Sequence, residues 1–150
     1  MAVIHQSSDL PDNPWTLAQL EIAHDRTPGD GLAGLVLSNY DLRGAQLAGA
    51  DLEDTTLQGA NLRGANLSYT FLAGANMQGA ALHGVTFEGA IFGNGEVNLN
   101  CALLDGADLT ATFGLTPASI RQASTDEHTK LPYQLKCEKP CAASIPLSAP

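Results

Sequence analysis

A large apolar residue recurs at every fifth position along the middle of the chain, with a small residue, usually Ala, two places before it. This interval fits neither a helix, which repeats its apolar face every ~3.6 residues, nor a half-buried strand, which repeats about every 2. A strict short repeat indicates a stacked array in which each unit buries its apolar face against its neighbours. Fifteen units follow one another, and their large residues are Leu37, Leu42, Leu47, Leu52, Leu57, Leu62, Leu67, Leu72, Met77, Leu82, Phe87, Phe92, Leu99, Leu104 and Leu109.

The other positions of the repeat suit turns. Gly often fills the last position of a unit, where a turn needs positive φ at no steric cost. Asn or Asp often precedes the large residue, where a short polar side chain bonds the nearby backbone. Two side chains of each five therefore point inward and three point outward. The spacing shifts by two residues before Leu99, and we place that insertion at Gly95-Glu96, at a corner.

These residues resemble the pentapeptide repeat family, whose motif is A-(D/N)-L-X-X, and the resemblance favours a bacterial member. The resemblance covers residues 35–114. It implies an all-β fold, a right-handed quadrilateral parallel β-helix with four units per coil and about four coils. Residues 1–34 then form an N-terminal segment with a capping helix, and residues 115–150 form short helices and a tail.

Both ends carry helix signals. Asn13 followed by Pro14 predicts a helix start, with Trp15 as a plug and an end near Asp25. Thr116 followed by Pro117 predicts a second short helix that Ile120 anchors. We expect these helices to cover the end coils, because an open sheet edge invites aggregation.

With four units per coil, residues twenty apart stack, and this arrangement aligns the outward side chains in columns. On face four, the residue before each large one reads Asp51, Phe71, Ile91 and Phe113. Three stacked apolar residues on the outside predict a buried contact. Either the chain's own tail, residues 133–150, or a second chain or partner would cover Phe71, Ile91 and Phe113.

On face two, the residue after each large one reads Arg43, Arg63, His83 and Asp105. Arg43, Arg63 and His83 at this spacing could hold an anion or an acidic partner. The alternative is a solvated ladder of charges that neighbouring acids relieve.

Catalytic and metal chemistry are not indicated. The interior predicted for the stack is apolar and filled, so it leaves no pocket on its axis. No arrangement of nucleophile, base and orienting acid is recognisable, and the four histidines are scattered. We therefore expect no enzyme activity, no cofactor and no metal. Cys137 and Cys141 are candidates for a small disulfide loop, which a reducing compartment would oppose.

Charge and hydropathy limit the partners. A net charge of −9 argues against direct nucleic-acid binding, which needs clustered Lys and Arg. No stretch is apolar enough to span a membrane, and the N-terminus lacks the pattern of a signal peptide. We expect a cytoplasmic protein, with a trimmed exported form as the alternative.

The functional prediction is a non-catalytic protein–protein interaction or scaffold module whose partner is unknown and which could be a homodimer. The first alternative comes from the resemblance. Some members that confer quinolone resistance mimic B-form DNA and bind DNA gyrase, and the net charge of −9 agrees with this. An enzyme or a metal-binding protein is the remote second alternative.

Overall fold

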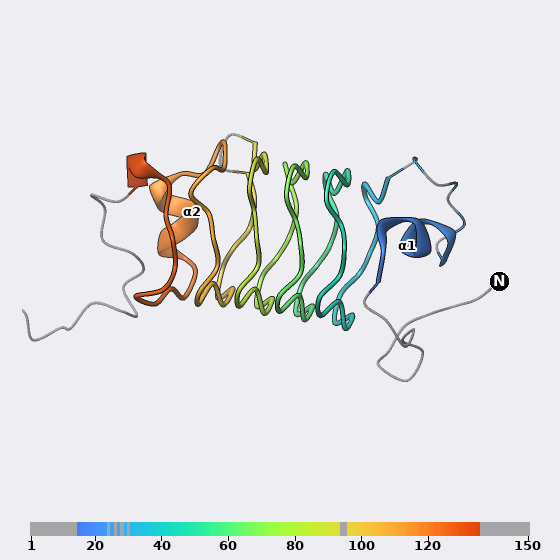
Figure 1. Ribbon diagram of the computed structural model, residues 1–150, viewed down its shortest axis with the longest axis horizontal. Coiled ribbons are helices and arrows are strands. Elements are labelled where there is room, and N and C mark those ends of the chain that lie inside the picture. Colours follow the sequence, from blue (N-terminus) through green and yellow to red (C-terminus); the bar gives the residue numbers. More distant parts are fainter. Residues whose placement is uncertain are drawn as a thin grey trace, which may run out of the picture.

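A computed structural model describes residues 15–23, 25, 27, 29, 31–93 and 96–135 of the chain (Figure 1). The described helical elements are α1 (Leu17–Ala23), α2 (Pro117–Arg121) and the short 3-10 helix η2 (Tyr133–Leu135). Between α1 and α2 the chain winds in coils that lie side by side along the long axis of the molecule (Figure 1). α1 lies at one end of this stack, and α2 and η2 lie at the other.

Parallel bridges join the coils in four ladders, one on each face. On face two, for example, Asp41 pairs with Asn61 and Asn61 pairs with Ala81. Each bridge is a single residue between turns, so the coils of the described region hold isolated bridges and no longer strands. The Leu62 amide donates to the Ala81 carbonyl at 2.8 Å, and the same bond recurs from coil to coil. Residues twenty apart therefore stack, as the repeat predicts.

The insertion lies where the bridge offset changes. Phe71 pairs with Ile91 at an offset of twenty, whereas Asn76 pairs with Asn98 and Ile91 with Phe113 at an offset of twenty-two. The two extra residues are thus accommodated between Ile91 and Asn98, at the corner after face four. Gly95, one of the two residues at which the insertion was predicted, lies outside the described residues.

The core is a dry column of side chains. All fifteen large residues of the repeat have no exposed surface, and most of the small residues are equally buried. Two small positions hold Thr, whose hydroxyls are satisfied inside the stack. Thr70 donates to the Leu67 carbonyl at 2.7 Å, and Thr55 donates to the Leu32 carbonyl of the preceding coil at 3.0 Å. A buried hydroxyl with a partner avoids most of the cost of desolvation.

The N-terminal helix begins later than the sequence pattern suggested. Asn13 and Pro14 lie outside the described residues, and the start of α1 is fixed instead by a capping box. The Gln19 amide donates to Thr16 Oγ1 at 3.2 Å, and the Thr16 amide donates to Gln19 Oε1 at 2.9 Å. Thr16 also forms a parallel bridge with Gln46, so the segment before α1 continues the face-three ladder beyond the first coil. Trp15 is buried beside it.

The connection from α1 to the coils is held by a buried carboxylate. Glu21 is almost completely buried, and it accepts hydrogen bonds from the amides of Gly29 and Gly31. The first coil then starts at Leu32, whose amide donates to the Asp51 carbonyl at 2.8 Å. The stack therefore begins slightly before residue 35, the predicted boundary.

At the C-terminal end the predicted helix is present. Thr116 caps α2, Pro117 occupies its first turn, and Ile120 is buried. The ladders nevertheless continue past Thr112, where the repeat stops in the sequence. Ser124 pairs with Leu103 and Lys130 pairs with Asp108, so α2 interrupts a further partial coil and does not follow the last one. No helix among the described residues is long and apolar enough to cross a membrane.

Candidate protein-interaction surface

Face four differs from the other faces at the position before each large residue. Elsewhere an Asn or Asp at this position often turns the chain by accepting the amide two residues later, as Asn66 does from Ser68 at 3.0 Å. On face four only Asp51 makes this bond, to the amide of Glu53 at 3.0 Å. The apolar residues further along the face cannot make it, so the turn does not explain their presence.

These apolar residues form one aligned group, which we call the apolar column: Phe71, Ile91 and Phe113. Phe71 pairs with Ile91 and Ile91 pairs with Phe113, so the three lie on successive coils. At about 4.8 Å per coil the column is roughly 10 Å long. Its side chains keep 44%, 39% and 63% of their surface exposed. An aligned and exposed apolar group of this kind is typical of an interaction site.

Tyr69 extends the apolar column at the corner before face four. It is 58% exposed and has a φ of 59°, at the repeat position that is most often Gly. Its ring lies over Gly89 of the next coil, and its hydroxyl donates to Glu88 Oε1 at 3.2 Å. This hydrogen bond raises the pKa of the Tyr69 hydroxyl. Sequence reasoning did not select Tyr69, although a bulky residue at a position that favours Gly was the available indication.

Carboxylates border the apolar column, and we call them the acidic rim: Asp51, Glu53, Asp54, Glu88 and Glu96. Asp51 begins the face-four ladder, and Asp54 lies over Gly74 at the corner that follows. Glu96 lies near Gly93 at that same corner, while Glu88 lies at the opposite corner beside Tyr69. The acidic rim therefore surrounds the column on both sides.

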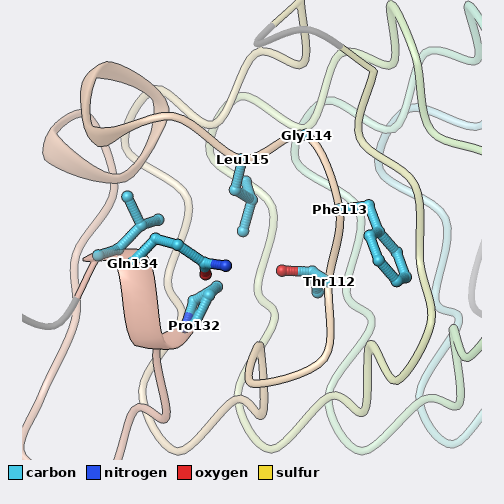
Figure 2. A pocket seen from close by; sticks show the side chains of 7 residues that line it. Thr112, Phe113, Gly114, Leu115, Pro132 and Gln134 are labelled. Carbon is cyan, nitrogen blue, oxygen red and sulfur yellow. The ribbon is translucent and has the colours of Figure 1, made fainter.

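A small pocket lies at the C-terminal end of the column. Its volume is about 180 Å³, and residues 112–115, Pro132, Gln134 and Leu135 line it (Figure 2). Figure 2 shows Thr112, Leu115 and Gln134 directed toward the space between the two segments. No residue of its lining is an acid, a base or a thiol, and the hydroxyl of Thr112 donates to the Leu109 carbonyl at 2.9 Å.

Two coverings were predicted for the column, the chain's own tail or a second chain. The tail is residues 133–150, of which the structure describes only 133–135, and Tyr133 there is exposed. The remaining residues of the tail lie outside the described part, so the choice between the two coverings stays open.

The predicted anion column on face two is aligned but largely neutralised. The amide of Gly44 donates to the Arg63 carbonyl and that of Gly64 to the His83 carbonyl, which stacks the three coils. Arg43 Nε donates to Asp41 Oδ1 at 2.8 Å, and this bond lowers the pKa of the Asp41 carboxyl.

His83 Nε2 lies 3.4 Å from Asp105 Oδ2. Within the described region, Arg63 is the member of this column that has no acidic partner. Arg43 and His83 each lie beside an acid, and this arrangement favours a solvated charge ladder over an anion site.

The predicted disulfide loop lies outside the described residues. Cys101 is an exposed thiol, whereas Cys137 and Cys141 lie outside the described part of the chain. Among the residues that the structure describes, no three His, Cys, Asp or Glu side chains come close enough to hold a metal ion.

The coil register and the exposed columns can now be compared with known proteins. The family model described as pentapeptide repeats matches with eight copies at residues 32–59 and 57–94. Residues 32–94 belong to the pentapeptide repeat family. The match lies within the stacked coils and includes Phe71 and Ile91 of the apolar column. Phe113 lies beyond the matched pentapeptide repeats, although its bridge to Ile91 continues their ladder.

Solved structures of pentapeptide repeat proteins resemble the chain. Rfr23 from the cyanobacterium Cyanothece 51142 is 34% identical, with a TM-score of 0.51 over 64% of this chain and 60% of its own. The chain thus spans less than two thirds of that relative. The alr5209 protein from Nostoc Pcc 7120 is 21% identical, with a TM-score of 0.56 over 77% of this chain and 100% of its own, which supports the fold alone.

QnrB1, a plasmid-mediated fluoroquinolone resistance protein, is 20% identical, with a TM-score of 0.31 over 69% of this chain and 64% of its own. That score carries no argument about this chain. None of the curated proteins compared with the chain matches it.

Proposed function

We propose that this protein is a non-catalytic interaction module. Its fold is a right-handed quadrilateral β-helix of pentapeptide repeats, and α1 and α2 cap the two ends of this β-helix. Face four binds a protein partner through the apolar column. The observation that carries the proposal is the alignment of Phe71, Ile91 and Phe113 on successive coils, with each side chain exposed. A filled apolar core leaves the outer faces as the surface on which the protein acts.

The size of the column indicates how it binds. Phe side chains bury about 150–250 Å² each, so covering the exposed parts of the three residues removes roughly 250–300 Å² of apolar surface from water. At about 25 cal/mol per Å² this contributes ~7 kcal/mol. Association costs an estimated 4–15 kcal/mol or more, so the column alone supports only a weak complex. A stable complex needs further contacts from the residues around it.

The test compares a disrupted column with a disrupted apolar residue on another face. Phe71→Ser combined with Ile91→Ser removes two of the three apolar side chains of the column without touching the core. Val36→Ser is the matched control, because Val36 occupies the same repeat position on face one and is 67% exposed. Each variant is immobilised. The amount of each native protein that the variant captures is then compared with the amount that the wild-type chain captures.

We expect the double variant to capture at least tenfold less of the partner protein than the wild-type chain does. Val36→Ser should capture as much as the wild-type chain. Equal capture by all three proteins would rule out the column as the binding surface. Circular dichroism of each variant verifies that the coils remain folded.

The second candidate is a DNA-mimicking inhibitor of DNA gyrase, which the net charge of −9 favours. The distribution of charge favours the first candidate, because Arg43 and Arg63 interrupt the acidic surface on face two. A supercoiling assay with purified gyrase separates the two. Inhibition that persists in the Phe71→Ser/Ile91→Ser variant would support DNA mimicry, whereas no inhibition at a large molar excess would exclude it.

A further inference from the structure

We propose that face four recognises a protein segment that combines apolar side chains with lysine or arginine. This inference rests on the proposed function and specifies the chemistry of the partner. The apolar column would bind the partner's apolar side chains, while the acidic rim would bind its cations.

Within the described part of the chain, no Lys or Arg neutralises the acidic rim. None of its five carboxylates forms an ion pair with a described residue. The described Arg and Lys residues lie elsewhere: Arg43 and Arg63 at the corner after face two, Arg121 in α2, and Lys130 paired with Asp108 on face three. Charged groups at the edge of an interface set partner choice and association rate, so an uncompensated acidic rim selects a cationic partner.

The aromatic residues of the surface also favour a cationic partner. Phe71, Phe113 and Tyr69 are exposed, and the face of an aromatic ring attracts a lysine or arginine cation. A cation that reaches the edge of the column can thus contact both a ring and a carboxylate. The Tyr69 ring and Glu88 already lie together, joined by their hydrogen bond.

The same charges disfavour a second copy of the chain on this face. Placing face four against face four would bring the acidic rims of two chains together, each chain already carrying a net charge of −9. Like charges in such a contact are costly unless cations are interposed. The charges therefore favour a cationic partner over a second copy of this chain as the occupant.

The experiment uses the full chain and three synthetic peptides of twelve residues. The probe alternates lysine with phenylalanine or leucine. One comparison peptide carries glutamate in place of every lysine, and the other carries serine in place of every apolar residue. Binding is measured by titration calorimetry at low and at moderate salt. We expect the probe to bind, the glutamate peptide not to bind, and the serine peptide to bind at least tenfold more weakly.

Variants localise the binding. Glu96→Gln removes one carboxylate of the acidic rim, and we expect it to weaken the probe by about two- to fivefold and to reduce the salt dependence. Glu127→Gln is the matched control, because it removes the same charge from an exposed position beyond Asp126, away from face four. It should leave the affinity of the probe unchanged.

Several results would overturn the inference. If the glutamate peptide binds as tightly as the probe, and Phe71→Ser weakens both, the column binds proteins but does not select cations. That outcome leaves the proposed function intact, whereas binding unaffected by Phe71→Ser would contradict both. Equal losses in Glu96→Gln and Glu127→Gln would indicate only a general attraction to an acidic protein.

Two further outcomes would identify a different occupant and reject the inference. Light scattering that shows double mass in the wild-type chain and single mass in Phe71→Ser would identify a second copy. If a peptide with the sequence of residues 136–150 binds a chain ending at residue 135 more tightly than the probe does, the chain's own tail is the occupant.

Discussion

At the scale of single residues, the large apolar side chains carry the stability of the stack. Leu62 has no exposed surface and lies between Leu42 and Leu82 of the neighbouring coils. We predict that Leu62→Ala lowers the free energy of unfolding by about 2–5 kcal/mol, because it leaves a cavity that the rigid coils cannot fill. Urea denaturation followed by circular dichroism measures the change.

The control for this prediction is Arg63→Ala, which changes the exposed neighbour of Leu62. A substitution at an exposed residue outside any ion pair should alter the free energy of unfolding by about 0.5 kcal/mol or less. Similar losses in the two variants would mean that the core does not dominate stability.

The glycines at the corners differ in what a side chain would meet. Gly79 has a φ of 67° and open space around the position of a Cβ, so Gly79→Ala should cost only the backbone strain, about 1–2 kcal/mol. A Cβ at Gly114 would overlap the carbonyl of Gly93 in the preceding coil. We predict a larger loss of thermal stability for Gly114→Ala than for Gly79→Ala. Equal melting temperatures would contradict the close approach of these two corners.

Much at this scale was predictable from the sequence. The recurrence of Leu determined which side chains point inward, and the Asn or Asp before it predicted the side-chain bonds such as that of Asn76 to the Gln78 amide. Tyr69 was not predicted as part of the surface. Its role depends on Gly89 and Glu88 of the next coil. The sequence pattern alone does not predict which residues are in contact at the corners of neighbouring coils.

At the scale of elements, the last partial coil is pinned to the stack by Asp126. Its carboxylate accepts the Gly106 amide at 3.0 Å and also the Thr129 hydroxyl. These bonds, chiefly that from Gly106, lower the pKa of Asp126 from its ordinary value of 3.8 to about 2. Because the folded pKa is depressed, the stabilisation is present above about pH 4 and is lost as pH falls toward 2.

This linkage predicts a pH-dependent effect of Asp126→Asn. The variant should have a lower urea midpoint than the wild-type chain at pH 6, and the difference should shrink as pH falls from 4 to 2. Glu127→Gln, which changes the neighbouring exposed carboxyl, should not show this convergence. A difference that stays constant over the whole range would mean that the charge of Asp126 does not hold the partial coil.

The end elements were only partly predictable. The Thr116-Pro117 signal located α2, because capping depends on adjacent residues. The predicted start of α1 is wrong by three residues, because the reciprocal bonds between Thr16 and Gln19 determine where the helix begins. The partial coil after α2 was missed as well. Ser124 and Lys130 join the ladders through backbone bonds. Such bonds do not require the side chains of the repeat, so the repeat pattern does not predict them.

The buried carboxylate of Glu21 offers a test of the N-terminal element. Glu21→Ala leaves the amides of Gly29 and Gly31 without their acceptor, which should cost about 1–3 kcal/mol. We expect faster hydrogen exchange at the amides of α1 and of the first coil, with little change near Leu104. Unchanged exchange around α1 would show that Glu21 does not hold this connection.

At the scale of the whole molecule, we assign stability to the inside of the stack and binding to one outer face. The repeat predicted both the twenty-residue register and the apolar column, because fixed spacing converts sequence positions into spatial columns. The acidic rim was not predicted, since Glu88, Glu96 and Asp54 meet face four only through the corners that the coils form.

The most direct test of this assignment is nuclear magnetic resonance mapping of an isotope-labelled chain titrated with the lysine–phenylalanine probe peptide. We predict that the resonances of Phe71, Ile91 and Phe113 shift with the probe, while those of Val36 on face one and Arg43 at the corner after face two stay in place. Shifts that gather around Val36 or Arg43 and leave the apolar column unchanged would contradict it.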